Sequence, residues 1–285
     1  MAGILYVVAT PIGNLEDVTL RALKILREVS LIAAEDTRRT ARLLQHYSIS
    51  TRTTSLHEHN EREKTPKLVA RLEAGESIAL VSDAGTPIVS DPGQALVAAA
   101  REAGIRVEPV PGASAVMAAV SASGLPAEAF AFLGFPPARS KDRKEWFERL
   151  GRAEHLSVFF EAPHRLRQTL EDLVAQVGGE HVIGVGRELT KVHEELVVRP
   201  INWHLDHFSE PRGEFTLLVP ARLAMPADVK PLPDAAALRL EFGQLTESGP
   251  SGGREALKTL AAKYGVSVNA LYRLINISTD GGHKT

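Results

Sequence analysis

Short apolar runs alternate with helix-forming segments along the first 120 residues of the chain. The runs at residues 4–9, 31–34 and 78–81 are apolar and predict strands of a buried sheet. A further strand is expected at 106–110. A polar, β-favouring run ahead of His57 adds one more strand. The segments between the runs are rich in Ala and Leu, or carry apolar residues at helical spacing, which predicts helices. These helices are expected to begin near Thr19, Asp36, Asn60, Gln94 and Ser114.

The same alternation resumes after a break of small residues, Gly and Pro at 121–126. Strands are expected at 130–133, 157–160, 182–185, 196–198 and 215–219, and helices at 141–150 and 166–177. The pattern therefore predicts an α/β fold with two domains, residues 1–121 and 122–222. We expect a mixed sheet in the second domain.

The C-terminal part has a different character. Prolines crowd a linker at 223–235, and residues 236–285 read as a small helical module. Within it, residues 254–272 have the pattern of a helix-turn-helix, with Gly265 in the turn and Ser267 capping the second helix. Such hairpins are often packing units, but this spacing favours nucleic-acid binding.

One loop stands out, residues 82–93 with the sequence SDAGTPIVSDPG. It joins the predicted strand 78–81 to the predicted helix 94–103. Its two glycines allow the backbone to approach a ligand closely, and its prolines stiffen it. Long ordered loops at the carboxyl ends of strands are typical of ligand sites in open α/β sheets.

Composition narrows the class of protein. The 285 residues are 44% hydrophobic and 24% charged, which is ordinary for a globular protein, and the absence of cysteine excludes disulfides and thiolate chemistry. We expect neither a secretory signal nor a membrane span, and hence a cytoplasmic protein without membrane contact. The net charge of −2 means that any RNA contact must come from local basic clusters.

Charged residues follow several predicted strands. Residues 35–40 (EDTRRT) carry acid and base together, and the alternative is that Asp36 or Thr37 merely caps a helix with solvated arginines. His57 and His59 lack an obvious third ligand, so we expect no metal site. The run 139–152 has basic residues around Trp146 and Phe147, which suits either a solvated helix face or an RNA backbone with an unstacked base.

Three motifs resemble a known family. The loop SDAGTPIVSDPG, the N-terminal VATPIGNLED at 8–17 and EAPHRL at 161–166 are similar to the tetrapyrrole-methylase superfamily, and most closely to its branch that acts on small-subunit ribosomal RNA. The resemblance implies S-adenosylmethionine bound between two α/β domains. It further implies 2′-O-methylation of a cytidine of 16S rRNA in the small ribosomal subunit. We also expect a homodimer.

The site residues follow from these motifs. The proton acceptor or the electrostatic groups of the reaction are expected among residues at strand ends: Glu35, Asp36, Arg38, Glu161, His164 and Lys191. The cofactor is expected to contact the breaker-rich segments that adjoin strands: Thr10, Pro11, Asp83, Ala84, Gly85, Ile88, Val89, Ser114, Ala115, Gly213, Glu214, Phe215 and Thr216.

Two other functions remain open at this point. A methylase of a corrinoid or porphyrin precursor shares the motifs but needs neither a basic arm nor a helical C-terminus. A DNA-binding regulator with a ligand-sensing domain would explain the helix-turn-helix, but it leaves two full α/β domains ahead of it unexplained. A nicotinamide fold is disfavoured because G-x-G-x-x-G is absent.

Overall fold

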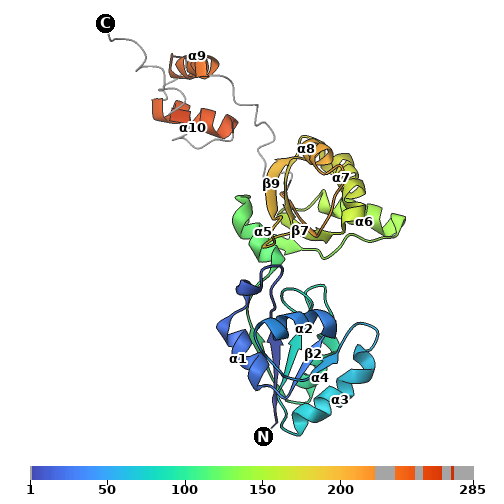
Figure 1. The fold of residues 1–285 in the computed structure, drawn as a ribbon. Helices are drawn as coiled ribbons and strands as arrows, with labels where there is room; N and C mark the ends of the chain where they lie inside the picture. The colour runs from blue at the N-terminus through green and yellow to red at the C-terminus, as the bar shows by residue number, and fades with distance from the viewer. Residues whose placement is uncertain (1, 222–234, 248–252, 265–270, 273–285) are drawn as a thin grey trace. The chain divides into compact units, whose positions relative to one another are not determined.

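The computed structural model describes residues 2–221, 235–247, 253–264 and 271–272. It forms two compact units, Met1–Pro220 and Ala221–Thr285. The first unit contains two sheets, each with its own helices, and the second is helical (Figure 1). The predicted α/β class with a C-terminal helical module is confirmed.

The first sheet is parallel throughout. Its strand order is β3-β2-β4-β1-β5. The chain first runs from β1 through β2 to the edge strand β3, and then from β4 to the opposite edge strand β5. Every residue of β2 and β4 is buried, as expected for parallel strands covered on both faces. The strands are β1 (Ile4–Val8), β2 (Leu31–Ala34), β3 (Thr53–Ser55), β4 (Ile78–Val81) and β5 (Arg106–Val110).

Helices cover both faces of this sheet. On one face, α1 (Leu20–Glu28) and α2 (Thr37–His46) contribute to a core with Ile32, Val81 and Val110. On the other face, α3 (Glu61–Glu73) and α4 (Gln94–Glu102) contribute to a core with Leu5, Ile78 and Leu80. The alternation of strand residues between the two cores follows from the period of two along a strand.

This arrangement creates a crevice between two neighbouring strands. β1 and β4 are adjacent, but β1 leads to α1 on one face and β4 leads to α4 on the other. Their loops therefore diverge at the carboxyl edge of the sheet. In doubly wound sheets such a switch point is where ligands bind.

The second sheet is mixed, as predicted. Its order is β6-β7-β10-β8-β9, with β6 and β7 parallel and the other pairs antiparallel. Three helices, α6 (Ser140–Leu150), α7 (Pro163–Val177) and α8 (Ile201–His207), pack on one face. The strands are β6 (Phe130–Phe132), β7 (Leu156–Glu161), β8 (Val182–Arg187), β9 (Glu195–Pro200) and β10 (Phe215–Val219).

The helix α5 (Ala115–Ser123) covers the opposite face of the second sheet. Its Val116 and Ala119 share a core with Val158 of β7 and Leu218 of β10. The predicted division at residue 121 falls inside this helix, near its carboxyl end, and stays a prediction.

The C-terminal unit contains two described helices, α9 (Ala235–Glu247) and α10 (Gly253–Lys263). Leu238, Leu260 and Tyr264 are buried between them, and Glu241 of α9 accepts hydrogen bonds from Lys263 and Tyr264. The predicted linker, the turn at Gly265 and the cap at Ser267 lie outside the described residues. The helix-turn-helix therefore stays a prediction.

Hydropathy and length argue against a spanning helix: none of the helices in the described ranges is both long and apolar enough to cross a bilayer.

Candidate active site

The loop at 82–93 is tied to the first strand-end turn by two backbone hydrogen bonds. The Thr10 amide donates to the Gly85 carbonyl at 2.9 Å, and the Gly85 amide donates to the Thr10 carbonyl at 3.0 Å. The two loops that leave β1 and β4 are thereby held against each other at the switch point.

The same loop has an unusual backbone. Ile88 (φ 76°) and Ser90 (φ 68°) are in the left-handed region, which a β-branched residue such as isoleucine rarely adopts. Ile88 packs against the core below α3 and α4, and this contact holds the loop in its strained form. Strain of this kind costs roughly 1–3 kcal/mol per residue and concentrates at ligand sites.

A cavity of about 340 Å³ opens beside this loop; we call it the cofactor cavity. Its volume lies within the range of roughly 300–1,000 Å³ that is typical of ligand pockets. Segments far apart in the chain converge on it. The lining consists of residues 84–86, 89–91, 114–116, 160–163 and 214–216, together with Ile12 and Phe135.

The lining of the cofactor cavity suits an adenosyl sulfonium. Phe135 and Phe160, with ring centroids 5.5 Å apart, offer apolar faces to an adenine. Asp91 and Glu214 place carboxylates in the wall, which favour a cation. At Gly85 (φ 84°) a Cβ would lie 3.3 Å from Ile12 Cγ2, so glycine keeps this approach open.

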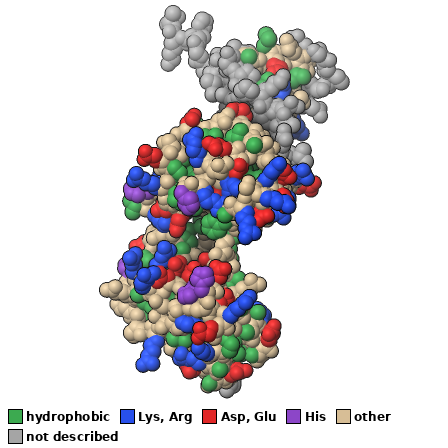
Figure 2. Space-filling model, turned by 90° about the vertical axis from the view of Figure 1, so that its right-hand side faces the viewer, with side chains coloured by type: hydrophobic (Ala, Val, Ile, Leu, Met, Phe, Trp, Pro, Cys, Tyr) green, Lys and Arg blue, Asp and Glu red, His purple; other side chains and the backbone are tan. Residues whose placement is uncertain are grey.

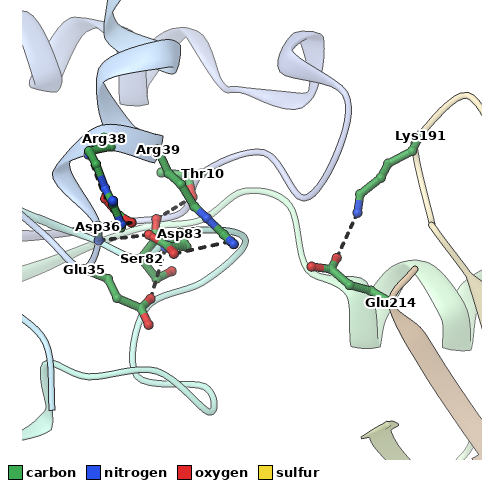
Figure 3. A network of polar contacts seen from close by, with 9 residues as sticks. All are labelled: Thr10, Glu35, Asp36, Arg38, Arg39, Ser82, Asp83, Lys191 and Glu214. Atoms are coloured by element: carbon green, nitrogen blue, oxygen red, sulfur yellow. Dashed lines mark hydrogen bonds and ion pairs between the residues drawn. The ribbon is translucent and has the colours of Figure 1, made fainter. Parts of the chain in front are cut away.

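Carboxylates gather at the ends of β2 and β4 (Figure 3). Asp83 is their hub: its Oδ1 accepts from the Asp36 amide at 3.0 Å, and its amide donates to Glu35 Oε2 at 3.2 Å. Arg39 lies 3.4 Å from Asp83 Oδ2. Burial raises the pKa of Glu35 above its ordinary value, and the nearby charge of Asp83 raises it further, although the amide of Asp83 opposes the shift. Figure 2 shows acidic side chains and histidines close together on one face of the protein.

Among the carboxyl groups that line the cofactor cavity, that of Asp91 has the most strongly shifted pKa. Burial raises its pKa from 3.8 to about 6, a hydrogen bond from Ser82 opposes the shift, and the charges of Glu35 and Asp83 add to it. Asp91 also lines a second cavity of about 510 Å³ with Glu35, Glu58, Glu61, His57 and His59, which we call the acidic cavity. Asp91 thus lies in the wall between the two.

A third cavity, of about 400 Å³, carries positive charge; we call it the cationic cavity. It is lined by Arg39 and Arg42 of α2, by Lys191, and by the two strand-end loops. Ile12, Ala84 and Glu214 line both this cavity and the cofactor cavity.

Lys191 is held between two carboxylates. Its Nζ donates to Glu188 Oε1 at 2.9 Å and to Glu214 Oε2 at 3.0 Å (Figure 3). Burial opposes its charge, but these two hydrogen bonds outweigh burial and raise the pKa of Lys191. Burial likewise opposes ionisation of Glu188, and the hydrogen bonds from Lys191 and from the Glu214 amide outweigh it, so the pKa of Glu188 is lowered. The pair therefore stays charged and fixes Glu214 at the junction of the cavities.

The family follows from a match over most of the first unit. The family described as Tetrapyrrole (Corrin/Porphyrin) Methylases matches residues 4–202. The chain belongs to the tetrapyrrole methylases. The prediction from the three sequence motifs is confirmed.

Other tetrapyrrole methylases are similar over nearly the whole chain. A protein of Vibrio cholerae named ribosomal RNA small subunit methyltransferase I is 45% identical over 276 residues, covering 95% of this chain and 94% of that protein. A protein of the same name from Synechocystis sp. is 45% identical over 282 residues, covering 98% of this chain and all of that protein.

A solved structure shares the fold. Uroporphyrin-III C-methyltransferase from Thermus thermophilus, complexed with S-adenosylhomocysteine, superposes with a TM-score of 0.55 at 19% identity. The match covers 76% of this tetrapyrrole methylase and 97% of that chain. At this identity the likeness concerns the fold.

The structure brings most of the predicted cofactor residues together. Ala84, Gly85, Val89 and the segments 114–115 and 214–216 all line the cofactor cavity. The other predicted cofactor residues do not: Thr10, Pro11 and Asp83 line the cationic cavity, Ile88 packs in the core, and Gly213 lines none of the cavities among the described residues.

The six predicted catalytic residues do not converge. Glu35 lines the acidic cavity and Lys191 the cationic one. Asp36 accepts two hydrogen bonds from the Arg38 side chain, at 3.1 and 2.7 Å, and these lower the pKa of Asp36. His164 is exposed and lines none of the cavities in the described part of the chain.

Glu161 lies in the cofactor-cavity wall, but its carboxylate is fully engaged. It is buried, accepts from Thr169 at 2.5 Å and from the Ala162 amide at 2.9 Å, and lies 3.8 Å from Arg143 and 3.6 Å from Arg165. These contacts favour a structural role for Glu161.

Of the two alternatives for the run 139–152, the one with an aromatic side chain free to stack on a base does not hold. Trp146 and Phe147 are buried in the second domain's core because they lie on the inner face of α6. Arg143 is also largely buried, donating to Asp172 at 2.7 Å and to Thr169 at 2.7 Å. The basic residues of this helix that remain exposed for an RNA contact are Lys141, Lys144 and Arg149.

Sequence reasoning missed several lining residues. Asp91 and Ser90 lie in the same loop motif as the predicted residues, and their place in the second half of the motif is the signal that could have found them. Phe160 could not be found by motif, because strand register brings it opposite Thr216. No group of three His, Asp or Glu side chains among the described residues is arranged to hold a metal.

Proposed function

We propose that this chain is an S-adenosylmethionine-dependent methyltransferase of small-subunit ribosomal RNA that methylates the 2′-hydroxyl of a cytidine in 16S rRNA. The observation that carries the proposal is its 45% identity, over 95% of the chain, to a protein named for that rRNA methyltransferase activity. The cofactor cavity supports it, since it joins apolar faces to carboxylates at the switch point of the fold.

When bound, S-adenosylmethionine supplies an electrophilic methyl group on a sulfonium. The chain's own part is to bind it, to orient the hydroxyl, and to receive a proton. Gly85 and the segments at 114–116 and 214–216 shape the cavity, and Asp91 and Glu214 favour the positive charge. Alignment of the two reactants accounts for much of the rate, because the donor is already reactive.

Transfer to the 2′-hydroxyl would release its proton. Glu214 would accept that proton; in support, Glu214 lines both the cofactor and the cationic cavity. Lys191, 3.0 Å away, holds that carboxylate in position.

Methyl transfer to small ribosomal subunits that lack the modification tests the proposal. With labelled S-adenosylmethionine, we expect label in 16S rRNA, and digestion to nucleosides should yield 2′-O-methylcytidine. Label on a base, or no label in subunits or in naked rRNA, would contradict it. A parallel reaction with a tetrapyrrole precursor should give no product.

Because the proposed substrate is a ribosomal particle, we propose that the protein acts in the cytoplasm. We also propose a homodimer. Sedimentation equilibrium should return twice the mass of one 30.8 kDa chain, and a monomer at micromolar concentration would contradict that part of the proposal.

A further inference from the structure

The cationic cavity shares a wall with the cofactor cavity. Ile12, Ala84 and Glu214 line both, so a molecule in one lies against a molecule in the other. A methyl acceptor must occupy such a neighbouring position, because the reacting atoms have to approach within roughly 3–3.5 Å.

The three cavities differ in the charge of their lining residues, and therefore in the ligands that they can bind. The acidic cavity carries Glu35, Glu58, Glu61 and Asp91, which would repel a phosphate. The cofactor cavity contributes carboxylates and no Lys or Arg among its lining residues. The cationic cavity alone of these three has arginine and lysine side chains in its wall.

Two of its cations are available for a ligand. Arg42 is exposed and makes no hydrogen bond or ion pair with its side chain within the described part of the chain. Arg39 is 63% exposed and lies 3.4 Å from Asp83, a longer contact than a close ion pair. Residues three apart on a helix lie on the same face, so Arg39 and Arg42 of α2 can contact one ligand together.

The neighbouring cations are already engaged. Arg38 is paired in a bidentate way with Asp36, and Lys191 is held by Glu188 and Glu214 (Figure 3). A guanidinium fork matches the geometry of a phosphate, which favours the two arginines as its ligands.

We propose that the cationic cavity binds the phosphodiester of the target nucleotide through Arg39 and Arg42, which places the ribose at the wall shared with the cofactor. The inference rests on the proposed function, because it takes RNA as the substrate.

Two arginine variants test it against matched controls. Arg39→Gln and Arg42→Gln are compared with Arg52→Gln and Arg101→Gln, two exposed arginines of the same domain. Arg52 precedes β3 and Arg101 is in the last turn of α4, so both lie at the amino edge of the sheet, away from the cavities. Thermal melting checks that all four fold.

Affinity for unmethylated small subunits is measured directly by filter binding over a salt series, and cofactor affinity by calorimetry. Each of Arg39→Gln and Arg42→Gln should weaken subunit binding by about tenfold. The double variant should flatten the slope of log affinity against log salt by up to about 0.7 units, the value for one phosphate contact on a single strand. Cofactor affinity should stay within about twofold, and the control pair should change neither quantity.

The inference would be overturned by an unchanged subunit affinity and salt slope in the double variant. It would also be overturned by a loss of cofactor affinity alone, since the arginines would then bind the carboxylate of the cofactor. Methyl transfer by the unsubstituted protein reports separately on the proposed function. If the protein binds subunits through these arginines but transfers no methyl group, the inference stands and the proposed function fails.

Discussion

Gly85 lines the cofactor cavity with a left-handed backbone. Gly85→Ala should weaken cofactor binding by about tenfold or more, because the new Cβ enters the approach path near Ile12. It should also cost about 1–2 kcal/mol of stability, because φ is 84°. Calorimetry with S-adenosylmethionine and thermal melting measure the two effects.

Gly124 provides the control for this substitution. It also has a left-handed backbone (φ 68°), but a Cβ there would meet nothing within 4 Å. Gly124→Ala should therefore lose similar stability and keep its cofactor affinity. Equal cofactor affinities in the two variants would remove Gly85 from the site.

Asp91 should make stability depend on pH. Its pKa is raised from 3.8 to about 6, so the folded protein holds this proton more tightly than the unfolded chain. Ionisation of Asp91 therefore lowers the free energy of unfolding, fully above about pH 6 and not at all below about pH 4. Asp91→Asn should gain stability relative to the parent as the pH rises through this window, by about 1 kcal/mol once solvent screening of this half-buried group is allowed for. Melting temperatures at pH 4.5 and 7.5 give the difference, and a constant difference would contradict the assignment.

The same carboxyl should link cofactor binding to pH. A sulfonium in the cavity favours the ionised form, so affinity should rise between pH 5 and 7 in the parent protein. His57, His59, Glu35 and Glu61 also line the adjoining acidic cavity, so other ionisable groups lie near Asp91. Only the part of the rise that disappears in Asp91→Asn belongs to Asp91.

At the scale of elements, most strands could be predicted from the sequence because they are buried on both faces. The continuous apolar runs of β2 and β4 have the predicted bounds. The short helix α8 was missed, since Trp203, His204 and His207 give it no clear apolar period. The cap expected from the Asn60 side chain does not form, because its amide oxygen accepts from the His57 amide instead.

Helix α6 shows why charge runs mislead. The sequence displays its basic residues, but the structure divides them between solvent and a buried network. Arg143 has a side-chain exposure of 11% and joins Asp172, Thr169 and Glu161. A one-dimensional pattern could not separate it from Lys141 and Lys144, because its partners are on β7 and α7.

Arg143→Gln should therefore destabilise the protein instead of weakening RNA binding specifically. It leaves the buried carboxylate of Glu161 with fewer partners, a change that costs about 3 kcal/mol. For comparison, Arg167→Gln removes an exposed pair with Glu171 and should cost less than about 1 kcal/mol. Urea unfolding measures both, and equal effects would refute a structural role for Arg143.

At the scale of the whole molecule, the site could be predicted only in part. Motifs with glycine and proline mark strand ends, and they located the loop at 82–93 and the segment 214–216, both of which contribute to the lining of the cofactor cavity. Phe135 and Phe160 depend on how the second sheet is paired, and pairing is a long-range property. The cationic cavity depends on five segments: the β1 turn, α2, residues 82–84, the β8–β9 loop and Glu214. No local sequence pattern could predict that they converge.

The division of the chain into two units leads to the last prediction. All lining residues of the cofactor and cationic cavities belong to Met1–Pro220, and α9 and α10 share a core of their own around Leu260. A chain ending at Pro220 should therefore bind S-adenosylmethionine within about twofold of the full chain. Its affinity for small subunits should fall by about tenfold if the C-terminal unit contributes one or two RNA contacts.

Leu260→Asp in the full chain tests whether the C-terminal unit has to be folded to bind RNA, or only has to be present. Leu260 is fully buried, and an unpaired carboxylate there should unfold the C-terminal unit while the first unit keeps its cofactor affinity. Loss of subunit binding in both variants would assign RNA binding to the folded unit. Loss only on truncation would assign it to the charged residues of the tail, and tight binding by both would reduce α9 and α10 to a packing unit.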